Sequence, residues 1–224
     1  MKQLIVILSG CFFILLACND NNQTAAESGV SDSARKSADS PATAHHDTSA
    51  STASGNLMMS SMTKHMDEMK NMKSMNDPDH DFAMMMKHHH MVATEMAQAE
   101  LSQGHHDDVK ALAKKMLDDQ TKEIKQIDNF LANTPADNKA GNDKFHHEAM
   151  QMMNDMPVKM DHSGKDVDQQ FTSMMISHHE QGIHMAKMYL KYGKKQEMKT
   201  LANKIINAQE KEIKELKDLQ AKSH

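Results

Sequence analysis

Two stretches of the sequence decide the fold: FAMMMKHHHMVATEMA at residues 82–97 and FTSMMISHHEQGIHMA at residues 171–186. They align at an offset of 89 residues, and the match continues without gaps over the whole of 82–131 against 171–220. A self-match of this length indicates an internal duplication. The folded part of the protein is therefore expected to contain two copies of one structural unit.

Each copy is predicted to be a hairpin of two helices. Apolar residues recur at every third or fourth position, which is typical of helices with one buried face. In the first copy, Asp79 or Asp81 is expected to cap the first helix, and Gly104 to follow its end as the C′ residue. Asp107 or Asp108 is expected to open the second helix.

The second copy repeats these signals, with Asp166 or Asp168 at its start and Gly193 at its turn. Two long hairpins with one-sided apolar stripes are expected to pack as an antiparallel four-helix bundle. We therefore predict an all-α protein with the bundle at 79–222: repeat one at 79–134, a Met-rich connection at 140–165 and repeat two at 166–222. Aromatic residues make up only 4% of the chain, which argues against an all-β fold.

Methionine and histidine dominate the composition, with 24 Met and 16 His in 224 residues. Thioether and imidazole are ligands for soft metal ions such as Cu(I) and Ag(I), and suit hard cations less well. Residues 57–78 form a second Met-rich stretch, predicted to be a short helix or arm beside the bundle. The number of Met residues exceeds what the core of a four-helix bundle is expected to use. The net charge of −5 argues against a nucleic-acid-binding protein.

The N-terminus has the pattern of an export signal. Lys2 precedes an apolar run at residues 4–17, which is shorter than a membrane-spanning helix needs. The run ends in Leu-Leu-Ala-Cys18, which resembles a bacterial lipobox and implies cleavage before Cys18 and lipid attachment there. Residues 1–17 are thus predicted to be a signal peptide and residues 18–56 a disordered tether. This places the protein in the bacterial cell envelope, lipid-anchored, on the periplasmic side.

The candidate metal ligands belong to a motif that occurs in both copies. Met85 lies four residues before His89, and Met86 four before His90, so each pair shares one helix face and can hold one ion. The duplication predicts two related sites, one in each hairpin. The full set of candidate ligands is Met85, Met86, His89, His90, Met96, Met174, Met175, His178, His179, His184, Met185 and Met188.

Polar residues on the second helix of each hairpin are level with these ligands. At about 1.5 Å per residue, Gln120 lies opposite His89 and Glu123 lies one turn further along. Gln209 and Glu212 take the same places in the second repeat. A Glu or Gln that accepts a hydrogen bond from one ring nitrogen would leave the other nitrogen available to a metal ion.

Several alternatives remain open at this stage. His and Met on an apolar seam also occur as ordinary core residues. A Met-rich chain can serve as an oxidant sink, and His residues alone can bind Zn(II) or Ni(II). A di-iron enzyme in a four-helix bundle needs Glu-x-x-His pairs, and this sequence contains none. We therefore expect a metal-binding protein that is not an enzyme, with Zn(II) a less suitable ion than Cu(I).

The repeated Phe-x3-Met-x2-His-His, Met-Ala and Leu-Ala…Gln-x-x-Glu-Ile motifs resemble the family called domain of unknown function 305. The resemblance covers about residues 79–220 and implies a ferritin-like four-helix bundle. The Met- and His-rich exported members, called CopM-like, imply periplasmic binding of Cu(I) and Ag(I) in copper resistance. Copper efflux or chaperone proteins are then the expected protein partners. The sequence departs from the family pattern at Lys87-His88, where Ile-Pro or a similar pair is common.

Overall fold

The computed structural model describes residues 48–139, 142–155 and 166–222. The secondary structure of these residues is entirely helical, without strands, which confirms the predicted all-α class. The predicted signal peptide, Cys18 and most of the predicted tether lie outside the described residues. In the described residues, no helix is apolar over a stretch long enough to span a membrane. The helices are α1 (Thr48–Lys70), α2 (Pro78–Gln103), α3 (Asp107–Asn133), α4 (Lys144–Asp155), α5 (Val167–Tyr192) and α6 (Gln196–Lys222).

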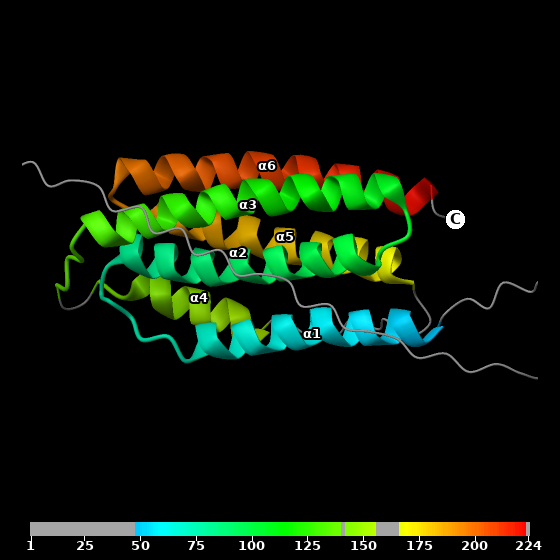
Figure 1. Cartoon of the computed structure of the whole chain (residues 1–224). Coiled ribbons are helices and arrows are strands. Elements are labelled where there is room, and N and C mark those ends of the chain that lie inside the picture. The colour runs from blue at the N-terminus through cyan, green and yellow to red at the C-terminus, as the bar shows by residue number, and fades with distance from the viewer. Residues whose placement is uncertain (1–47, 140–141, 156–165, 223–224) are drawn as a thin grey trace, which may run out of the picture. The chain divides into compact units, whose positions relative to one another are not determined.

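The six helices form three layers of two helices each (Figure 1). Helices α2 and α3 form the first hairpin, α5 and α6 the second, and the two hairpins meet mainly where α2 packs against α5. Helices α1 and α4 cover the side of α2 and α5 that faces away from α3 and α6. The predicted four-helix bundle is therefore present, with a third layer added to it.

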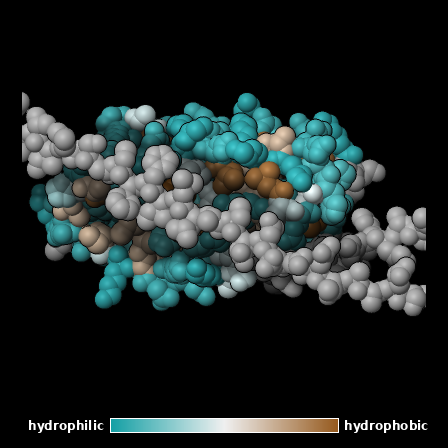
Figure 2. Space-filling view, viewed as in Figure 1, coloured by the Kyte–Doolittle hydropathy of each residue, from teal (hydrophilic) through white to brown (hydrophobic). Residues whose placement is uncertain are grey.

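This third layer buries the two central helices on nearly every side. Phe82, Ala83 and Met85 on α2 are all fully buried, although they spread over about 160° of the helix. A helix that buries more than one face belongs in the middle of a larger core. In contrast, α3 and α6 bury one face and expose the other, and the side seen in Figure 2 is mainly hydrophilic.

The expectation that the Met residues exceed the needs of the core is wrong for much of the chain. Helix α1 contributes Met58, Met62, Met66 and Met69 to the core, and α4 contributes Met153. Methionine is unbranched and flexible, so it fills the irregular space between the outer and central layers. Among the described residues, Met75 is the only large hydrophobic side chain that is exposed.

Two helix starts differ from their predicted positions. Helix α1 begins at Thr48, inside the predicted tether, because the Ser-, Thr- and Ala-rich sequence before residue 57 contains no proline to stop it. Helix α2 is capped by Asp77, which accepts a hydrogen bond of 2.9 Å from the Asp79 backbone N–H. Pro78 is then the first residue of the helix, a position that favours proline.

Gly104 and Gly193 end α2 and α5 as predicted, but not in a left-handed conformation. Both are extended, with φ of −66° and −60°. A Cβ atom at Gly104 would lie 2.0 Å from Glu100 Oε1, and one at Gly193 would lie 2.3 Å from the ring of Tyr189. Glycine is needed at each turn because the side chain one helical turn earlier folds over it.

Two aspartates fasten the hairpins to each other. The carboxylate of Asp79 on α2 accepts hydrogen bonds of 3.0 and 2.9 Å from the backbone amides of residues 194 and 195, at the turn of the second hairpin. Asp168 on α5 accepts bonds of 3.0 and 2.9 Å from the amides of residues 105 and 106, at the turn of the first. Neither aspartate caps its own helix, and each instead satisfies backbone groups of the other repeat.

The buried partner of each aspartate differs between the repeats. The Tyr189 hydroxyl donates to Asp79 at 2.5 Å, whereas Glu100 occupies the corresponding place beside Asp168. The pKa of Glu100 is raised to about 8, mainly by burial and in addition by the negative charge of Asp168. A protonated Glu100 can donate to Asp168, so it does in one repeat what the tyrosine hydroxyl does in the other.

We expect Asp79→Ala to lower the free energy of unfolding of the full chain by roughly 2–4 kcal/mol, because it leaves a buried hydroxyl and two backbone amides without their charged acceptor. Denaturant unfolding followed by circular dichroism measures this cost. Asp118→Ala is the control, because Asp118 pairs only with exposed Lys114 on the same helix and such pairs contribute about 0.3–0.5 kcal/mol. Equal costs for the two variants would contradict the fastening role.

We expect Glu100→Gln to remove part of the pH dependence of stability. With a pKa of about 8 in the folded state and 4.5 otherwise, Glu100 holds a proton that unfolding releases between these values. Its contribution to the free energy of unfolding therefore falls as pH rises from about 5 to about 8, by at most ~1.4 kcal/mol per pH unit, and is constant above. Chemical denaturation at several pH values in this range should show that the free energy of unfolding of Glu100→Gln increases relative to that of the parent as pH rises. If the two free energies changed with pH in parallel, the raised pKa of Glu100 would be refuted.

Candidate metal centre

Four histidines from the two central helices lie together in the core: His89 and His90 on α2, and His178 and His179 on α5. None exposes more than 2% of its surface. The rings of His89 and His178 stack with centroids 3.6 Å apart and an angle of 23° between their planes. Within each pair, the ring centroids are 6.1 and 6.2 Å apart. The two predicted sites, one in each hairpin, are thus joined into one cluster.

The outer histidine of each pair is bound to a carboxylate from the second helix of its hairpin. His90 Nε2 donates to Glu123 Oε2 at 2.8 Å, and His179 Nε2 donates to Glu212 Oε2 at 3.0 Å. A carboxylate can only accept here, so Nε2 carries a hydrogen. A hydrogen held on Nε2 leaves Nδ1 as the nitrogen through which the imidazole ring would ligate a metal ion.

Each glutamate is also reached by a lysine from the opposite repeat. Lys204 Nζ lies 3.3 Å from Glu123 Oε1, and Lys115 Nζ lies 2.7 Å from Glu212 Oε1. Burial by itself raises the pKa of Glu212, but the hydrogen bonds from His179 and Lys115 outweigh it and lower the pKa below its usual value. Glu212 is therefore ionised at neutral pH and stays an acceptor for His179.

The inner histidines are neutral. Burial lowers the pKa of His89 and of His178 well below the usual range, and the neighbouring histidines lower it further. His89 Nε2 lies 3.0 Å from the backbone oxygen of His178 and donates to it. This bond again places the hydrogen on Nε2 and leaves the lone pair on Nδ1.

Several buried polar atoms of the cluster have no hydrogen-bond partner among the described residues. They are the Nδ1 atoms of all four histidines, the Nε2 atom of His178 and the side-chain amides of Gln120 and Gln209. A buried polar atom without a partner costs about 1–3 kcal/mol. Buried water or a bound ion would supply the missing interactions.

The predicted Met ligands are buried in the core on the same two helices as the histidines, whereas one predicted His lies on the surface. Met86 precedes His90 by one helical turn, and Met175 precedes His179 in the same way, so each thioether lies beside an imidazole on the same helix. His184 is exposed on α5 and lies outside the cluster. The buried Met candidates are Met85, Met86, Met96, Met174, Met175, Met185 and Met188.

Gly182 lets the two repeats approach at the cluster. A Cβ atom at this position would lie 2.6 Å from Gln209 Oε1 and 2.7 Å from Cε1 of His89. The second repeat thus carries glycine where the first carries Ala93, and the gap that results receives the His89 ring from the other repeat. Local sequence patterns cannot reveal this role, because it depends on how α2 and α5 meet.

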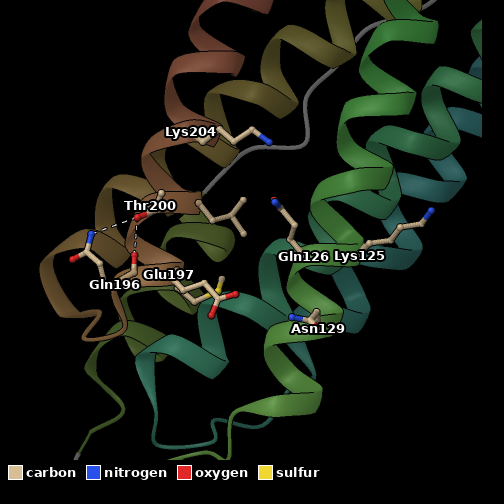
Figure 3. Close-up of a pocket in the computed structure, with 9 residues that line it drawn as sticks. Lys125, Gln126, Asn129, Gln196, Glu197, Thr200 and Lys204 are labelled. Carbon is tan, nitrogen blue, oxygen red and sulfur yellow. Dashed lines mark hydrogen bonds between the residues drawn. The ribbon is translucent and has the colours of Figure 1, made fainter.

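The structure also brings together residues that the sequence analysis did not select. His65 and Glu68 on α1 and His88 on α2 offer ligand atoms that all lie within 4.8 Å of one another. A surface groove of about 590 Å³ lies between α3 and α6 and includes Lys204, which also reaches Glu123 (Figure 3). The groove contains no histidine, and Met198 is its one thioether.

The fold and the cluster define a class of duplicated helical bundles with His and Met gathered in the core. The sequence model of DUF305, a domain of unknown function, matches residues 19–131 and 132–220. The chain therefore belongs to the DUF305 family, as the sequence motifs predicted. A comparison with curated protein sequences gave no match.

Solved structures of this family are similar to the chain. CopM in its Cu(I)-bound form is 26% identical, with a TM-score of 0.51 over 65% of this chain and 97% of CopM. A DUF305 protein from Streptomyces coelicolor is 23% identical, with a TM-score of 0.55 over 66% of this chain and 95% of that protein. CopM soaked with silver is 28% identical, with a TM-score of 0.48 over 64% and 96%.

We expect Gly182→Ala to destabilise the full chain by more than about 1 kcal/mol, because the new methyl group collides with the buried His89 ring. In an ordinary helix interior, the same change stabilises by about 0.5–1 kcal/mol. The reverse change at the corresponding position, Ala93→Gly, is the control and should cost only the usual helix penalty plus one buried methyl group. A gain in thermal stability for Gly182→Ala would show that the repeats do not meet there.

Proposed function

We propose that the protein is an exported metal-binding protein that holds Cu(I), with Ag(I) as a surrogate, in the cluster of four buried histidines and neighbouring methionines. It is not an enzyme in this proposal, and its role is copper buffering, resistance or delivery. Lipid attached to Cys18 anchors it to the membrane on the periplasmic side. Copper efflux or chaperone proteins are the partners that such a role requires.

The observation that carries the proposal is the set of four buried histidines whose Nδ1 atoms have no hydrogen-bond partner among the described residues. Imidazole nitrogen and thioether sulfur together favour Cu(I) over hard cations. The site has no carboxylate among its innermost donors, so it suits an ion of low charge. Glu123 and Glu212 hold the outer rings from behind, which orients them and makes them better donors. CopM, which is similar to this chain, has been solved in a Cu(I)-bound form, and this supports Cu(I) as the ion in the proposal.

The other candidate functions fit these residues less well. An oxidant sink needs accessible thioethers, whereas the Met side chains beside the histidines are buried. A di-iron centre needs several carboxylates that ligate the metal, but Glu123 and Glu212 are already bound to histidine and lysine. Zn(II) at the cluster would be bound by the imidazoles alone, because thioether sulfur favours Cu(I).

We expect the double variant Met86→Leu/His90→Gln to lower Cu(I) affinity at least tenfold while the fold is kept. Leucine preserves the volume of methionine, with a packing cost below ~1.5 kcal/mol, and glutamine can still donate to Glu123. Met175→Leu/His179→Gln should have the same effect. Because the His89 and His178 rings touch, the two losses should couple rather than add. Competition against a Cu(I) chelator measures the affinity, and circular dichroism checks the fold.

Met198→Leu and His106→Gln are the matched controls, since one is a buried methionine on α6 and the other an exposed histidine with no cap bond. Both should bind Cu(I) as the parent does. Zn(II) at the same free concentration should not displace Cu(I). Full Cu(I) affinity in the combined four-residue variant, or displacement by Zn(II), would reject the proposal.

A further inference from the structure

A second group of ligand residues lies away from the four-histidine cluster, where α1 packs on α2. His65 Nδ1 is 2.9 Å from Glu68 Oε2, and His88 Nδ1 is 3.5 Å from the same oxygen. The two rings are tilted at 57° with centroids 6.0 Å apart. Three ligand atoms thus converge on one small volume from two different helices.

The helical registers explain this convergence. His65 and Glu68 are three residues apart on α1, so they share one face. The buried Met62, Met66 and Met69 fix that side of α1 against the bundle. His88 belongs to the Lys87-His88 pair noted in the sequence analysis, and its ring lies beside His65 and Glu68 of α1. Because Glu68 is 40% exposed and His65 only 2%, the group lies at the edge of the interface, within reach of ions from solvent.

A further carboxylate orients His65. Glu95 Oε1 lies 3.2 Å from His65 Nε2, and Glu95 itself accepts a hydrogen bond from the Ser61 hydroxyl. His65 therefore lies between two carboxylates, Glu95 at Nε2 and Glu68 at Nδ1. With the ring hydrogen donated to Glu95, the Nδ1 atom faces Glu68 as a metal ligand would. The Nδ1 atoms of His65 and His88 thus face the same carboxylate oxygen of Glu68. A cation held between the two rings and this carboxylate would be ligated by all three groups.

We propose that His65, Glu68 and His88 form a separate site for a divalent transition-metal ion, Zn(II) or Cu(II). Two imidazole nitrogens and one carboxylate, with a further position open to water, are a common ligand set for Zn(II). The same donors bind Cu(II) more tightly than Zn(II). The site does not depend on the four-histidine cluster, and its ion would tie α1 to α2.

The test is a titration of the full chain with Zn(II) and with Cu(II), in the parent and in His65→Gln and Glu68→Gln. Each variant should lose one bound divalent ion or at least tenfold in affinity. Co(II) should give the intense visible bands of a four-coordinate site in the parent and not in the variants. Cu(I) affinity should stay within about twofold of the parent, so that failure here is separable from failure of the Cu(I) proposal.

Two further measurements keep the site falsifiable if a variant loses stability. Glu95→Gln, a change in a positioning residue, should keep the number of ions but weaken Zn(II) binding about 10–100-fold. Zn(II) should slow hydrogen exchange in α1 of the parent and not of Glu68→Gln. His105→Gln, an exposed histidine change, is the control. Two results would overturn the proposal. One is unchanged Zn(II) and Cu(II) binding in both His65→Gln and Glu68→Gln; the other is loss of the divalent ion in His90→Gln instead of in these two variants.

Discussion

The structure depends on the packing of α2 against α5 in the middle layer. Both helices are covered by α3 and α6 on one side and by α1 and α4 on the other, so a polar side chain at their contact cannot reach water. His89 and His178 stack at that contact. Burial of imidazole without partners is unfavourable, and a helix contact optimised only for stability would carry apolar residues instead. The histidines therefore point to a function that the protein retains against its own stability.

The duplication makes the two hairpins dependent on each other. Asp79 and Asp168 each satisfy amides at the turn of the opposite hairpin. Lys115 and Lys204 each cross to the glutamate that holds a histidine of the other repeat. These contacts are related by the same offset as the sequence repeat. One hairpin alone would expose both its apolar face and its unpaired polar groups, so the pair is the smallest unit expected to be stable.

Periodicity and self-alignment predicted the helices and the hairpins. They also predicted that Gln120 and Glu123 lie opposite the His pair of the same hairpin, because this follows from the spacing of residues along each helix. The Met-rich stretch before the bundle was predicted to be a helix or arm beside it. That α1 and α4 together form a third layer was not predictable, since a Met stripe does not reveal which face of the bundle it covers. The number of Met residues indicated surplus ligands, whereas a helix buried on two sides accounts for Met85 and Met86 as core residues. The stacking of His89 on His178, and the meeting of His65 with His88, depend on how separate helices pack, which no local pattern encodes.

The two proposed sites differ in how deeply they are buried, and this difference determines the charge of the ion that each can hold. The energy needed to bury an ion rises steeply with its charge, so a dry core can accept a monovalent ion held by neutral nitrogen and sulfur more readily than a divalent one. At the edge of α1 the conditions are reversed, because Glu68 supplies a negative charge and remains half-exposed to water. A divalent ion needs both of these. The same layered packing that shields the four histidines thus leaves, at its outer contact, a position suited to a harder ion.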